Sequence, residues 1–583
     1  MSVVREEFHL KVIYLGRESR RTNSLPSGDE DVIELLSNSW NDYGYETTFI
    51  TVCRVGGKRF ELGTIRLLIA GEENSRQFLN AYLKDDWDGT FPISGVDYIS
   101  TPSEIAFYEQ LDGALPDGDA IKVAESLRDA SYLVHLTEDD RARELVETRG
   151  FHDSLQRERG SIEAYLDGWR ILDRESVAAN NIVFKFKDVY QNISKIDLRF
   201  SHSGSPLPRD INVLIGANGV GKSRLLHQIV DAWIADSTNA VDTGFETPPN
   251  ISRLVVISYS PFELFPVDME SSNLLDKSAY QYCGFRGRST PTDASDSETL
   301  PPIRLSREIP KKDATKSLLS CVSDDQRYRV IKGWGQKVKT AERVLRSAID
   351  FDYMALEVNA NTRSMFFDSE ALLTSPILEI KDRKERKRYV LVNEETVLGL
   401  NCLRLFEHLV LKAGVVFIKD GAPRELSSGQ RLFSYVVINI LGAVKRNSLV
   451  LVDEPELFLH PSLEVQLIEM LKQILYSFNS RAILATHSLS TVREIPADCV
   501  HVMERTDDGL VIKTPPFQTF GGDVQRIASY VFGDKSISKP FERWIRKQLE
   551  ERDDSAENLI SALGDDINEE LIIQIRAMER RQW

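Results

Sequence analysis

The sequence has few cysteines, and their spacing excludes the usual roles of paired cysteines. The five cysteines are scattered over 583 residues without a C-x-x-C pair. The nine histidines form no H-E-x-x-H motif and no close pair. Zinc sites usually take their sulfur and imidazole ligands from such short spacings. The pattern argues against a disulfide framework and a zinc or histidine-rich metal centre, and it is typical of a reducing compartment.

Long apolar runs and excess positive charge are also missing. No apolar run approaches the ~20 residues of a membrane-spanning helix, and the N-terminal stretch MSVVREEFHLKV is charged too early for a secretory signal. The net charge of −17 argues against a surface that coats nucleic acid broadly. We therefore expect a cytoplasmic protein with no membrane partner, in which only local basic patches could contact nucleic acid.

The length and the apolar content are sufficient for several domains. A chain of 583 residues exceeds the ~250–300 residues at which single cores stop growing. Its composition, 42% hydrophobic and 28% charged, is that of a globular protein. We predict an N-terminal α+β domain (1–180), a main α/β domain with an insertion (181–515, insertion at about 267–425) and a C-terminal helical tail (516–583).

The first 180 residues show strand and helix patterns without a catalytic motif. Two runs rich in β-branched and aromatic residues, Glu46–Val55 and Arg59–Ala70, meet at Gly56-Gly57, which predicts a hairpin. A capping-box sequence at Thr137–Asp140 predicts a helix start. The region could be a sensor or partner-docking domain, or a structural appendage. Further helical patterns lie at Ser75–Leu83, Ser103–Leu111 and Asp119–Leu136.

The stretch Ile211–Leu226, INVLIGANGVGKSRLL, has a phosphate-binding pattern. An apolar strand ends at Gly216 and a helix begins near Lys222, with G-x-x-x-x-G-K-S between them. Glycines let the backbone curl so that its N–H groups face phosphate oxygens, and a helix N-terminus favours the same negative charge. In this pattern Lys222 reaches the β- and γ-phosphates, and the Ser223 hydroxyl binds Mg²⁺. For the motif alone, the alternative is a glycine-rich turn that binds nothing.

Two later stretches could contribute to the same site. LSSGQ, Leu426–Gln430, precedes a helical run; it could present N–H groups to an anion or only cap the helix. SLVLVDEP, beginning at Ser448, is an apolar strand that ends in Asp453 and Glu454. Asp453 is suited to hold Mg²⁺ and Glu454 to polarise an attacking water, although an acidic strand end is common without either role.

A third stretch, Arg481–Ser488, is another buried-type strand and ends at His487. The histidine could contact the γ-phosphate, or it could be an ordinary core histidine. Each motif is weak alone. The spacing from Gln430 to Asp453 and from Glu454 to His487 leaves room for one helix and one strand each, and this spacing with the order of the motifs favours a single phosphate site built from all of them.

Two basic runs lie in the insertion. Lys316–Ala348 is predicted to be helical and is locally basic, and KDRKERKR, Lys381–Arg388, is predicted to turn between strands Ile377–Ile380 and Tyr389–Val392. A solvated face is the favoured interpretation of both, with a nucleic-acid contact as the alternative. The polar stretch Ser289–Pro302 is predicted to be a loop.

Taken together, these motifs resemble the head of ABC-type ATPases, over about residues 181–502. GANGVGKS resembles Walker A, LSSGQ the signature motif, LVDEP Walker B, and His487 the switch histidine. The chain is most similar to the non-transporter group that contains RecF, the SMC proteins and the OLD nucleases. The string DEPELFLHP, Asp453–Pro461, resembles the OLD-like branch, many of whose members, including the Septu and PARIS ATPase subunits, serve in bacterial anti-phage defence.

The resemblance implies an ABC-type P-loop ATPase head, with a mixed β-sheet core and a helical lobe, that uses ATP and Mg²⁺. It implies a homodimer closed by ATP, in which the signature of one protomer contacts the ATP of the other; higher oligomers are left open. The implied catalytic residues are Lys222, Glu454 and His487, and the implied metal ligands are Ser223 and Asp453. The implied nucleotide-binding residues are Gly216, Asn218, Gly219, Gly221, Lys222, Ser223 and Arg224 with, in trans, Ser427, Ser428, Gly429 and Gln430.

The sequence departs from the family pattern at the Q-loop. No glutamine follows the strand that ends near Ser258, in SYSPFELFP. Ser258 or Ser260 could substitute, or another residue could contact Mg²⁺ and water, and turnover could be slow. The residues after His487 look helical rather than alternating, so a TOPRIM nuclease domain is not expected, and no H-N-H pattern is present.

Two functions follow from this pattern. The first is an ATPase subunit that dimerises on ATP and regulates a partner effector, a nuclease or a toxin, in prokaryotic anti-phage defence. The second is a DNA-repair or DNA-organising ATPase of the RecF or SMC kind that acts directly on DNA. A transporter's nucleotide-binding subunit fits less well, because of the insertion and the appended N-terminal domain.

Overall fold

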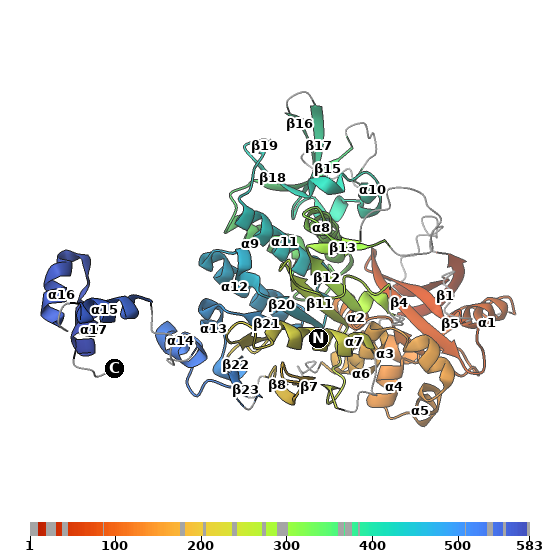
Figure 1. Cartoon of the computed structure of the whole chain (residues 1–583). Helices are drawn as coiled ribbons and strands as arrows, with labels where there is room; N and C mark the ends of the chain where they lie inside the picture. Colours follow the sequence, from red (N-terminus) through yellow and green to blue (C-terminus); the bar gives the residue numbers. More distant parts are fainter. Residues whose placement is uncertain are drawn as a thin grey trace, which may run out of the picture. The chain divides into compact units, whose positions relative to one another are not determined.

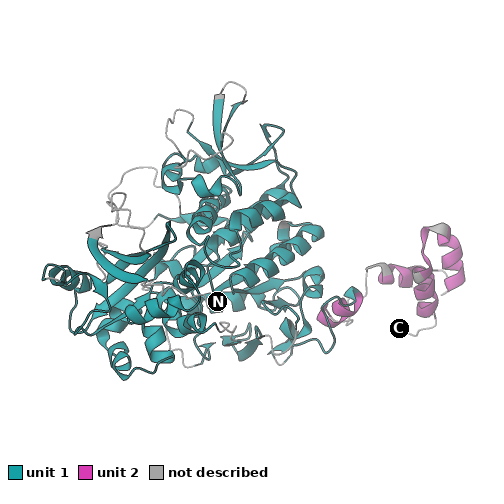
Figure 2. Ribbon diagram, turned by 180° about the vertical axis from the view of Figure 1, so that it is seen from behind, with its two compact units in different colours: residues 1–524 teal, residues 525–583 magenta. Residues whose placement is uncertain are grey.

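The computed structural model of the chain divides into two compact units, Met1–Val524 and Gln525–Trp583 (Figure 2). In the part of the chain that the structure describes, no helix is long and apolar enough to cross a membrane. The described residues are 10–18, 31–37, 45–85, 87–174, 181–201, 206–235, 242–270, 276–288, 301–359, 366–367, 376–382, 385–507, 509–532, 540–551 and 555–579.

The first unit begins with a six-stranded sheet of order β5-β1-β2-β3-β4-β6. The hairpin predicted at Gly56-Gly57 is confirmed: β3 and β4 pair antiparallel, and both glycines have positive φ. Helices follow the sheet in the chain. The strands are β1 (Lys11–Glu18), β2 (Val32–Ser37), β3 (Thr48–Val55), β4 (Lys58–Ile69), β5 (Thr90–Phe91) and β6 (Tyr98–Pro102), and the helices are α1 (Ser75–Tyr82), α2 (Ala106–Ala114), α3 (Asp119–Ser126), α4 (Ala130–His135), α5 (Asp140–Val146) and α6 (Arg159–Leu172).

Two helix predictions for this region are wrong in detail. The single helix predicted for Asp119–Leu136 is two helices, because Arg128 has a φ of +51° and Asp129 accepts a hydrogen bond from the Tyr132 N–H as the N-cap of α4. The helix predicted to start at Thr137 starts later, since the side chain of Asp139 caps α5 by accepting from the Ala142 N–H. In both cases a local carboxylate decides where the helix begins.

A seven-stranded central sheet of order β12-β11-β20-β21-β9-β22-β23 forms the second core. All neighbouring strands are parallel except the pair β22–β23. Strands β9, β20 and β21 are buried at every residue, as expected for parallel strands covered on both faces. The strands are β9 (Ile211–Ile215), β11 (Arg253–Ser258), β12 (Tyr280–Gly284), β20 (Ser448–Asp453), β21 (Arg481–Thr486), β22 (Val500–Thr506) and β23 (Gly509–Lys513).

Helices and two smaller sheets complete this core. The mixed α/β class predicted from the sequence is confirmed. A further sheet has three strands in the order β10-β7-β8. Its strands β7 and β8 come before the P-loop, Gly216–Ser223, in the chain. The elements are β7 (Ile182–Lys187), β8 (Ile193–Leu198), β10 (Gly244–Phe245), β13 (Arg286–Arg288), β14 (Ile303–Leu305), α7 (Lys222–Ala235), α11 (Ser428–Ala443), α12 (Pro461–Ser477) and α13 (Leu489–Arg493).

The insertion contributes two helices and a five-stranded sheet of order β16-β17-β15-β18-β19. Figure 1 shows α8 and α9 beside α11, which they contact. The single continuous helix predicted for Lys316–Ala348 is wrong, because α8 and α9 are separate helices. The elements are α8 (Ile309–Arg327), α9 (Lys337–Arg346), α10 (Cys402–Glu407), β15 (Tyr353–Val358), β16 (Ile377–Asp382), β17 (Glu385–Val392), β18 (Val415–Lys419) and β19 (Ala422–Pro423).

The basic run Lys381–Arg388 is mostly strand rather than turn, because β16 extends to Asp382 and β17 begins at Glu385. Arg388 pairs with Glu379 at 3.2 Å across the ladder, so its charge is partly neutralised. Most of the loop predicted at Ser289–Pro302 lies outside the described residues.

The second unit is helical. α15, α16 and α17 share a small apolar core that includes Ile545, Leu559 and Ile575. The helices towards this end of the chain are α14 (Val524–Phe532), α15 (Pro540–Glu550), α16 (Ala556–Leu563) and α17 (Glu569–Glu579). The division predicted at residues 180 and 515 stays a prediction.

Candidate functional site

The order of the central strands places the predicted site residues at one edge of the sheet. β20 lies beside β21, and β21 lies beside β9, all parallel. Their carboxyl ends therefore meet at one edge. The P-loop follows β9, Asp453 ends β20, and His487 follows β21. The sequence places these strands far apart in the chain, and the topology brings them together.

The P-loop glycines are required for different reasons. A Cβ on Gly216 would lie 2.2 Å from the carbonyl oxygen of Met503, which leaves no room for a side chain. Gly219 and Gly221 have φ values of +80° and +102°, a region that disfavours other residues. Asn218 and Gly219 are exposed, so the outer part of the loop is accessible to a ligand.

Lys222 is buried beneath this loop, with 5% of its surface exposed. Its Nζ donates to the carbonyl oxygens of Gly216 (3.1 Å) and Ala217 (3.3 Å), and lies 2.8 Å from Nε2 of His487. Burial lowers the pKa of Lys222 to about 8, opposed by the nearby carboxylates, Glu454 first. A phosphate bound at the loop would place negative charge beside this ammonium and so favour its charged form. Arg224, two residues further on, is exposed.

Ser223 and Asp453 lie in direct contact, since the Ser223 hydroxyl donates to Oδ1 of Asp453 at 2.8 Å. Asp453 is 3% exposed. Burial raises the pKa of Asp453 to about 7, and the charges of Glu454 and Glu263 also raise it. A hydroxyl and a carboxylate oxygen are ligands that Mg²⁺ prefers, and a cation would relieve the cost of a buried carboxylate. The pair therefore fits a Mg²⁺ ion bound with phosphate.

Glu454 has a backbone conformation that is unusual for its residue type. Its φ of +47° and ψ of +57° lie in the left-handed region, which costs about 1–2 kcal/mol for a residue with a Cβ. The Glu454 N–H donates to the carbonyl oxygen of Ala485 at 2.8 Å, which holds the turn against β21. Its carboxylate lies 3.8 Å from Nε2 of His487 and is about one quarter exposed. The strained turn thus keeps a carboxylate accessible beside the P-loop.

His487 is held by a residue to which the sequence analysis gave no role in the site. The buried carboxylate of Glu456 accepts a hydrogen bond from the His487 N–H, and burial raises the pKa of Glu456. Burial first, and then the charge of Lys222, lower the pKa of His487. The imidazole is therefore neutral near pH 7 and can both accept and donate a hydrogen bond. In the sequence, this contact was indicated only by the further acidic residue, Glu456, that follows Asp453 and Glu454 in DEPE.

The LSSGQ turn caps α11. Ser427 and Gln430 form a reciprocal capping box, in which the Ser427 Oγ accepts from the Gln430 N–H and the Gln430 side chain accepts from the Ser427 N–H. The Gln430 Nε2 also donates to the carbonyl oxygen of Ala348 at 2.7 Å. Ser427 and Ser428 are exposed, and Gly429 lies beside them in the first turn. The described hydrogen bonds of this turn run to its own helix and to Ala348, not to the P-loop of the same chain.

The loop after β11 contains the two serines considered as substitutes for the Q-loop glutamine. Ser258 pairs with Asp453 in the β11–β20 register, and its buried Oγ has no hydrogen-bond partner among the described residues. Ser260 accepts from the Phe262 N–H at 3.4 Å, within its own loop. Glu263, to which the sequence analysis gave no role, accepts from the Tyr282 hydroxyl at 2.5 Å and from the Phe265 N–H at 2.7 Å.

Comparison with known proteins adds a family match. Residues 356–493 match the family model described as "AAA domain, putative AbiEii toxin, Type IV TA system". The match includes LSSGQ, Asp453, Glu454 and His487, and it begins after the P-loop.

Residues 356–493 are therefore similar to an AAA domain.

Individual relatives are distant. Protein ea59 of Escherichia phage lambda is 22% identical over 528 residues, which cover 88% of each chain. A nucleotide-free ATP-binding cassette from an ABC transporter is 12% identical with a TM-score of 0.21, and covers 53% of this chain and 82% of that chain. UvrA2 from Deinococcus radiodurans is 13% identical with a TM-score of 0.24, and covers 69% of this chain and 43% of that chain.

Proposed function

We propose that the protein hydrolyses ATP, dimerises when ATP binds, and uses the dimer to regulate a partner effector in the cytoplasm. The observation that carries this proposal is the convergence of Lys222, Asp453 and His487 at the carboxyl ends of three adjacent parallel strands. Open α/β sheets bind ligands outside this edge. The OLD-like sequence DEPELFLHP supports the same branch of ATPases.

In this mechanism the P-loop binds the phosphates of ATP through its N–H groups and Lys222. Ser223 and Asp453 would hold Mg²⁺, which neutralises charge on the phosphates. Glu454 accepts the proton of the attacking water. The neutral His487 contacts the γ-phosphate. Because His487 also lies 2.8 Å from Lys222, its hydrogen bonds change when that phosphate leaves. Ser258 takes the place of the Q-loop glutamine; its unpartnered hydroxyl beside Asp453 supports it over Ser260.

The dimer is proposed from the position of the signature turn. Ser427 and Ser428 are exposed at the N-terminus of α11, a position suited to anion binding. We propose that Ser427, Ser428 and Gly429 of one protomer close on the ATP held by the other. Gln430 holds the turn in shape through Ala348.

The biological role is proposed from the family wording and the phage relative. The family description names a toxin and a toxin–antitoxin system, and the relative is a phage protein. Both fit an ATPase that acts in the conflict between phages and their hosts, with a nuclease or toxin as the regulated effector. The direct DNA-binding alternative is less well supported, since the chain has a net charge of −17 and Arg388 of the basic hairpin is paired with Glu379.

The role is tested with the Glu454→Gln variant, which removes the general base and should trap the ATP-bound dimer. Affinity purification of this variant with ATP should recover a protein effector at stoichiometric yield, and Lys222→Ala, which should not hold ATP, serves as the control. Recovery of DNA that is released by salt, without a protein partner, would contradict the proposed role.

Catalysis is tested separately with Lys222→Ala. We expect this variant to lose ATP hydrolysis, because the buried ammonium that contacts the phosphates is gone. ATP hydrolysis at the parent rate in Lys222→Ala would contradict the assignment of the site.

A further inference from the structure

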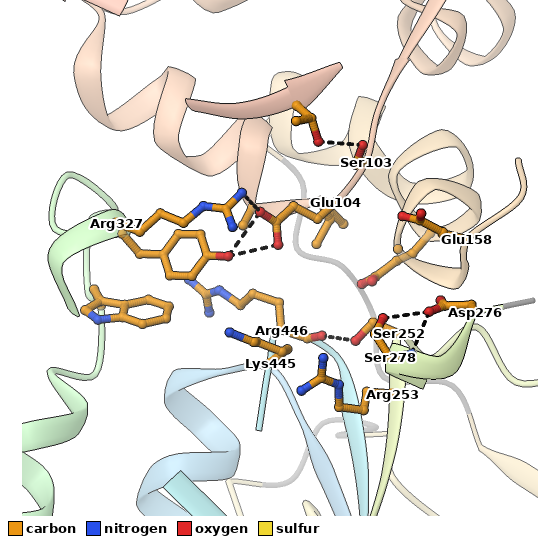
Figure 3. Close-up of a pocket in the computed structure, with 17 residues that line it drawn as sticks. Ser103, Glu104, Glu158, Ser252, Arg253, Asp276, Ser278, Arg327, Lys445 and Arg446 are labelled. Carbon is orange, nitrogen blue, oxygen red and sulfur yellow. Dashed lines mark hydrogen bonds and ion pairs between the residues drawn. The ribbon is translucent and has the colours of Figure 1, made fainter. Parts of the chain in front are cut away.

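A polar cavity of about 280 Å³ lies where three parts of the first unit meet (Figure 3). The N-terminal region contributes Glu104 and Glu163, strand β11 and the connection before β20 contribute Arg253 and Lys445, and α8 contributes Arg327. Its volume lies just below the usual range for ligand pockets, and so suits a small molecule rather than a nucleoside triphosphate.

The cavity is separate from the ATP site. Arg253 begins β11, and Lys445 lies just before β20. The opposite ends of these two parallel strands, Ser258 and Asp453, lie at the ATP site. Six-residue strands separate the two edges by about 17 Å, at about 3.3 Å per residue.

The cationic side chains of the cavity are incompletely neutralised. The Arg253 guanidinium donates to the Ala443 carbonyl oxygen (3.1 Å) and to Gln281 (3.4 Å), neither of which carries charge. Lys445 shares the carboxylate of Asp324 with Lys337, at 2.5 Å and 2.7 Å, so two ammonium groups face one carboxylate. Burial lowers the pKa of both Arg253 and Lys445, against the pull of nearby carboxylates. An anion in the cavity would favour their charged forms.

Two of the carboxylates that line the cavity, Glu104 and Asp276, already accept hydrogen bonds from donors of the protein. Glu104 accepts from Arg327 at 2.5 Å and from the Tyr328 hydroxyl at 2.9 Å, and Figure 3 shows Arg327 paired with Glu104 at the cavity wall. Asp276 accepts from the Ser278 N–H and hydroxyl. Their charge is therefore directed to protein partners, while Arg253 and Lys445 retain capacity for a ligand.

One buried polar atom points to a ligand independently. Glu163 is 1% exposed, and its Oε1 has no hydrogen-bond partner among the described residues. Burial raises the pKa of Glu163 well above its usual range, with the charges of Asp167 and Glu109 adding to the effect. A raised pKa favours the protonated carboxyl group, which is the form that can donate a hydrogen bond. A buried polar atom without a partner is costly unless a ligand or water satisfies it.

We propose that this cavity binds a small oxyanion, a phosphate or carboxylate group, which contacts Arg253 and Lys445 and accepts a hydrogen bond from Glu163. The site joins the N-terminal region to the two strands that end at the ATP site. A small metabolite bound in the cavity would thus contact the edge of the central sheet opposite the nucleotide site, and its binding would be sensed there.

The test is isothermal titration calorimetry on the full chain with inorganic phosphate and, separately, with malonate. All proteins carry Lys222→Ala, so that phosphate binding at the P-loop does not contribute and the result does not depend on the proposed ATPase activity. Binding of phosphate alone identifies a phosphate ligand, and binding of malonate alone or of both identifies a carboxylate-tolerant site.

Three further substitutions locate the binding. Arg253→Gln should weaken it about tenfold or more, since a charge-assisted contact is lost, and Arg304→Gln, an exposed arginine in β14 away from the cavity, should leave it unchanged. Glu104→Gln should tighten binding several-fold, because it removes a negative charge and frees Arg327; a misfolded variant cannot produce this gain. Failure of both anions to bind, or equal affinity in the Arg253→Gln and Arg304→Gln proteins, would overturn the proposal.

Discussion

At the scale of single residues, two P-loop positions require glycine for different reasons: one has no space for a side chain, and the other has a positive φ. Gly216 has no space for a Cβ, which would meet the Met503 carbonyl oxygen at 2.2 Å, whereas Gly219 has open space but a φ of +80°. We predict that Gly216→Ala lowers the free energy of unfolding by about 3 kcal/mol, through overpacking against backbone. Gly219→Ala should cost only about 1 kcal/mol of conformational strain. Urea unfolding of both variants checks this order, and equal losses would contradict it.

A buried carboxyl group in the N-terminal region, that of Asp129, makes stability depend on pH. Burial raises the pKa of Asp129 from 3.8 to about 7, so the folded state holds its proton where the unfolded state has lost it. Stability therefore falls as pH rises towards the folded pKa. Between pH 6 and 8 the loss is about 1.4 kcal/mol for a group with a folded pKa near 7.

Asp129→Asn tests this dependence, because an asparagine can still cap α4 but does not ionise. We expect the free energy of unfolding of the parent to fall by about 1.4 kcal/mol more than that of the variant between pH 6 and 8. The same pH dependence in both proteins would show that Asp129 is ionised throughout.

The sequence predicted that the residues of the candidate site lie together, and the structure places them together, whereas the contacts that support them could not be predicted. Lys222, Asp453 and His487 follow strands whose apolar runs are unambiguous, and the ends of parallel strands meet at one edge. The contact of Glu456 with the His487 N–H and the lack of space at Gly216 depend on distances that only the fold defines.

At the scale of elements, two neighbouring serines of the LSSGQ turn have different roles: Ser427 has a structural role, and Ser428 has a proposed functional one. Ser427 is the N-cap of α11, and Ser428 makes no capping bond there. We predict that Ser427→Ala lowers the free energy of unfolding by about 1 kcal/mol. Ser428→Ala should leave stability unchanged and lower ATP hydrolysis, because in the proposed dimer its hydroxyl contacts the ATP of the second protomer. Thermal unfolding and a phosphate-release assay distinguish the two, and full activity of Ser428→Ala would contradict its role in trans.

Element boundaries were predicted well where turns carry glycine and poorly where polar residues end a helix. The hairpin at Gly56-Gly57 follows from the positive φ that both positions adopt. The break at Arg128 depends instead on the Asp129 cap and its tertiary surroundings. The basic run Lys381–Arg388 resembles a solvated turn in sequence, but cross-strand pairs such as Glu379 with Arg388 make it a hairpin.

At the scale of the whole molecule, charged pairs tie the N-terminal region to the rest of the first unit. Arg446 donates to Glu109 at 2.7 Å, and Arg327 pairs with Glu104 at 2.5 Å. These partners are hundreds of residues apart in the chain. No sequence pattern could have paired them, and the cavity lined by Glu104, Arg327 and Arg446 could not have been predicted.

The central claim is that the ATP site is half of a composite site, completed by a second copy of the chain. Glu454→Gln should bind ATP without hydrolysing it, and light scattering after size exclusion should then show twice the 66.2 kDa mass of one chain. Without ATP, or with the added change Lys222→Ala, the mass should remain that of one chain. A Glu454→Gln protein that holds ATP and stays at 66.2 kDa would contradict the account.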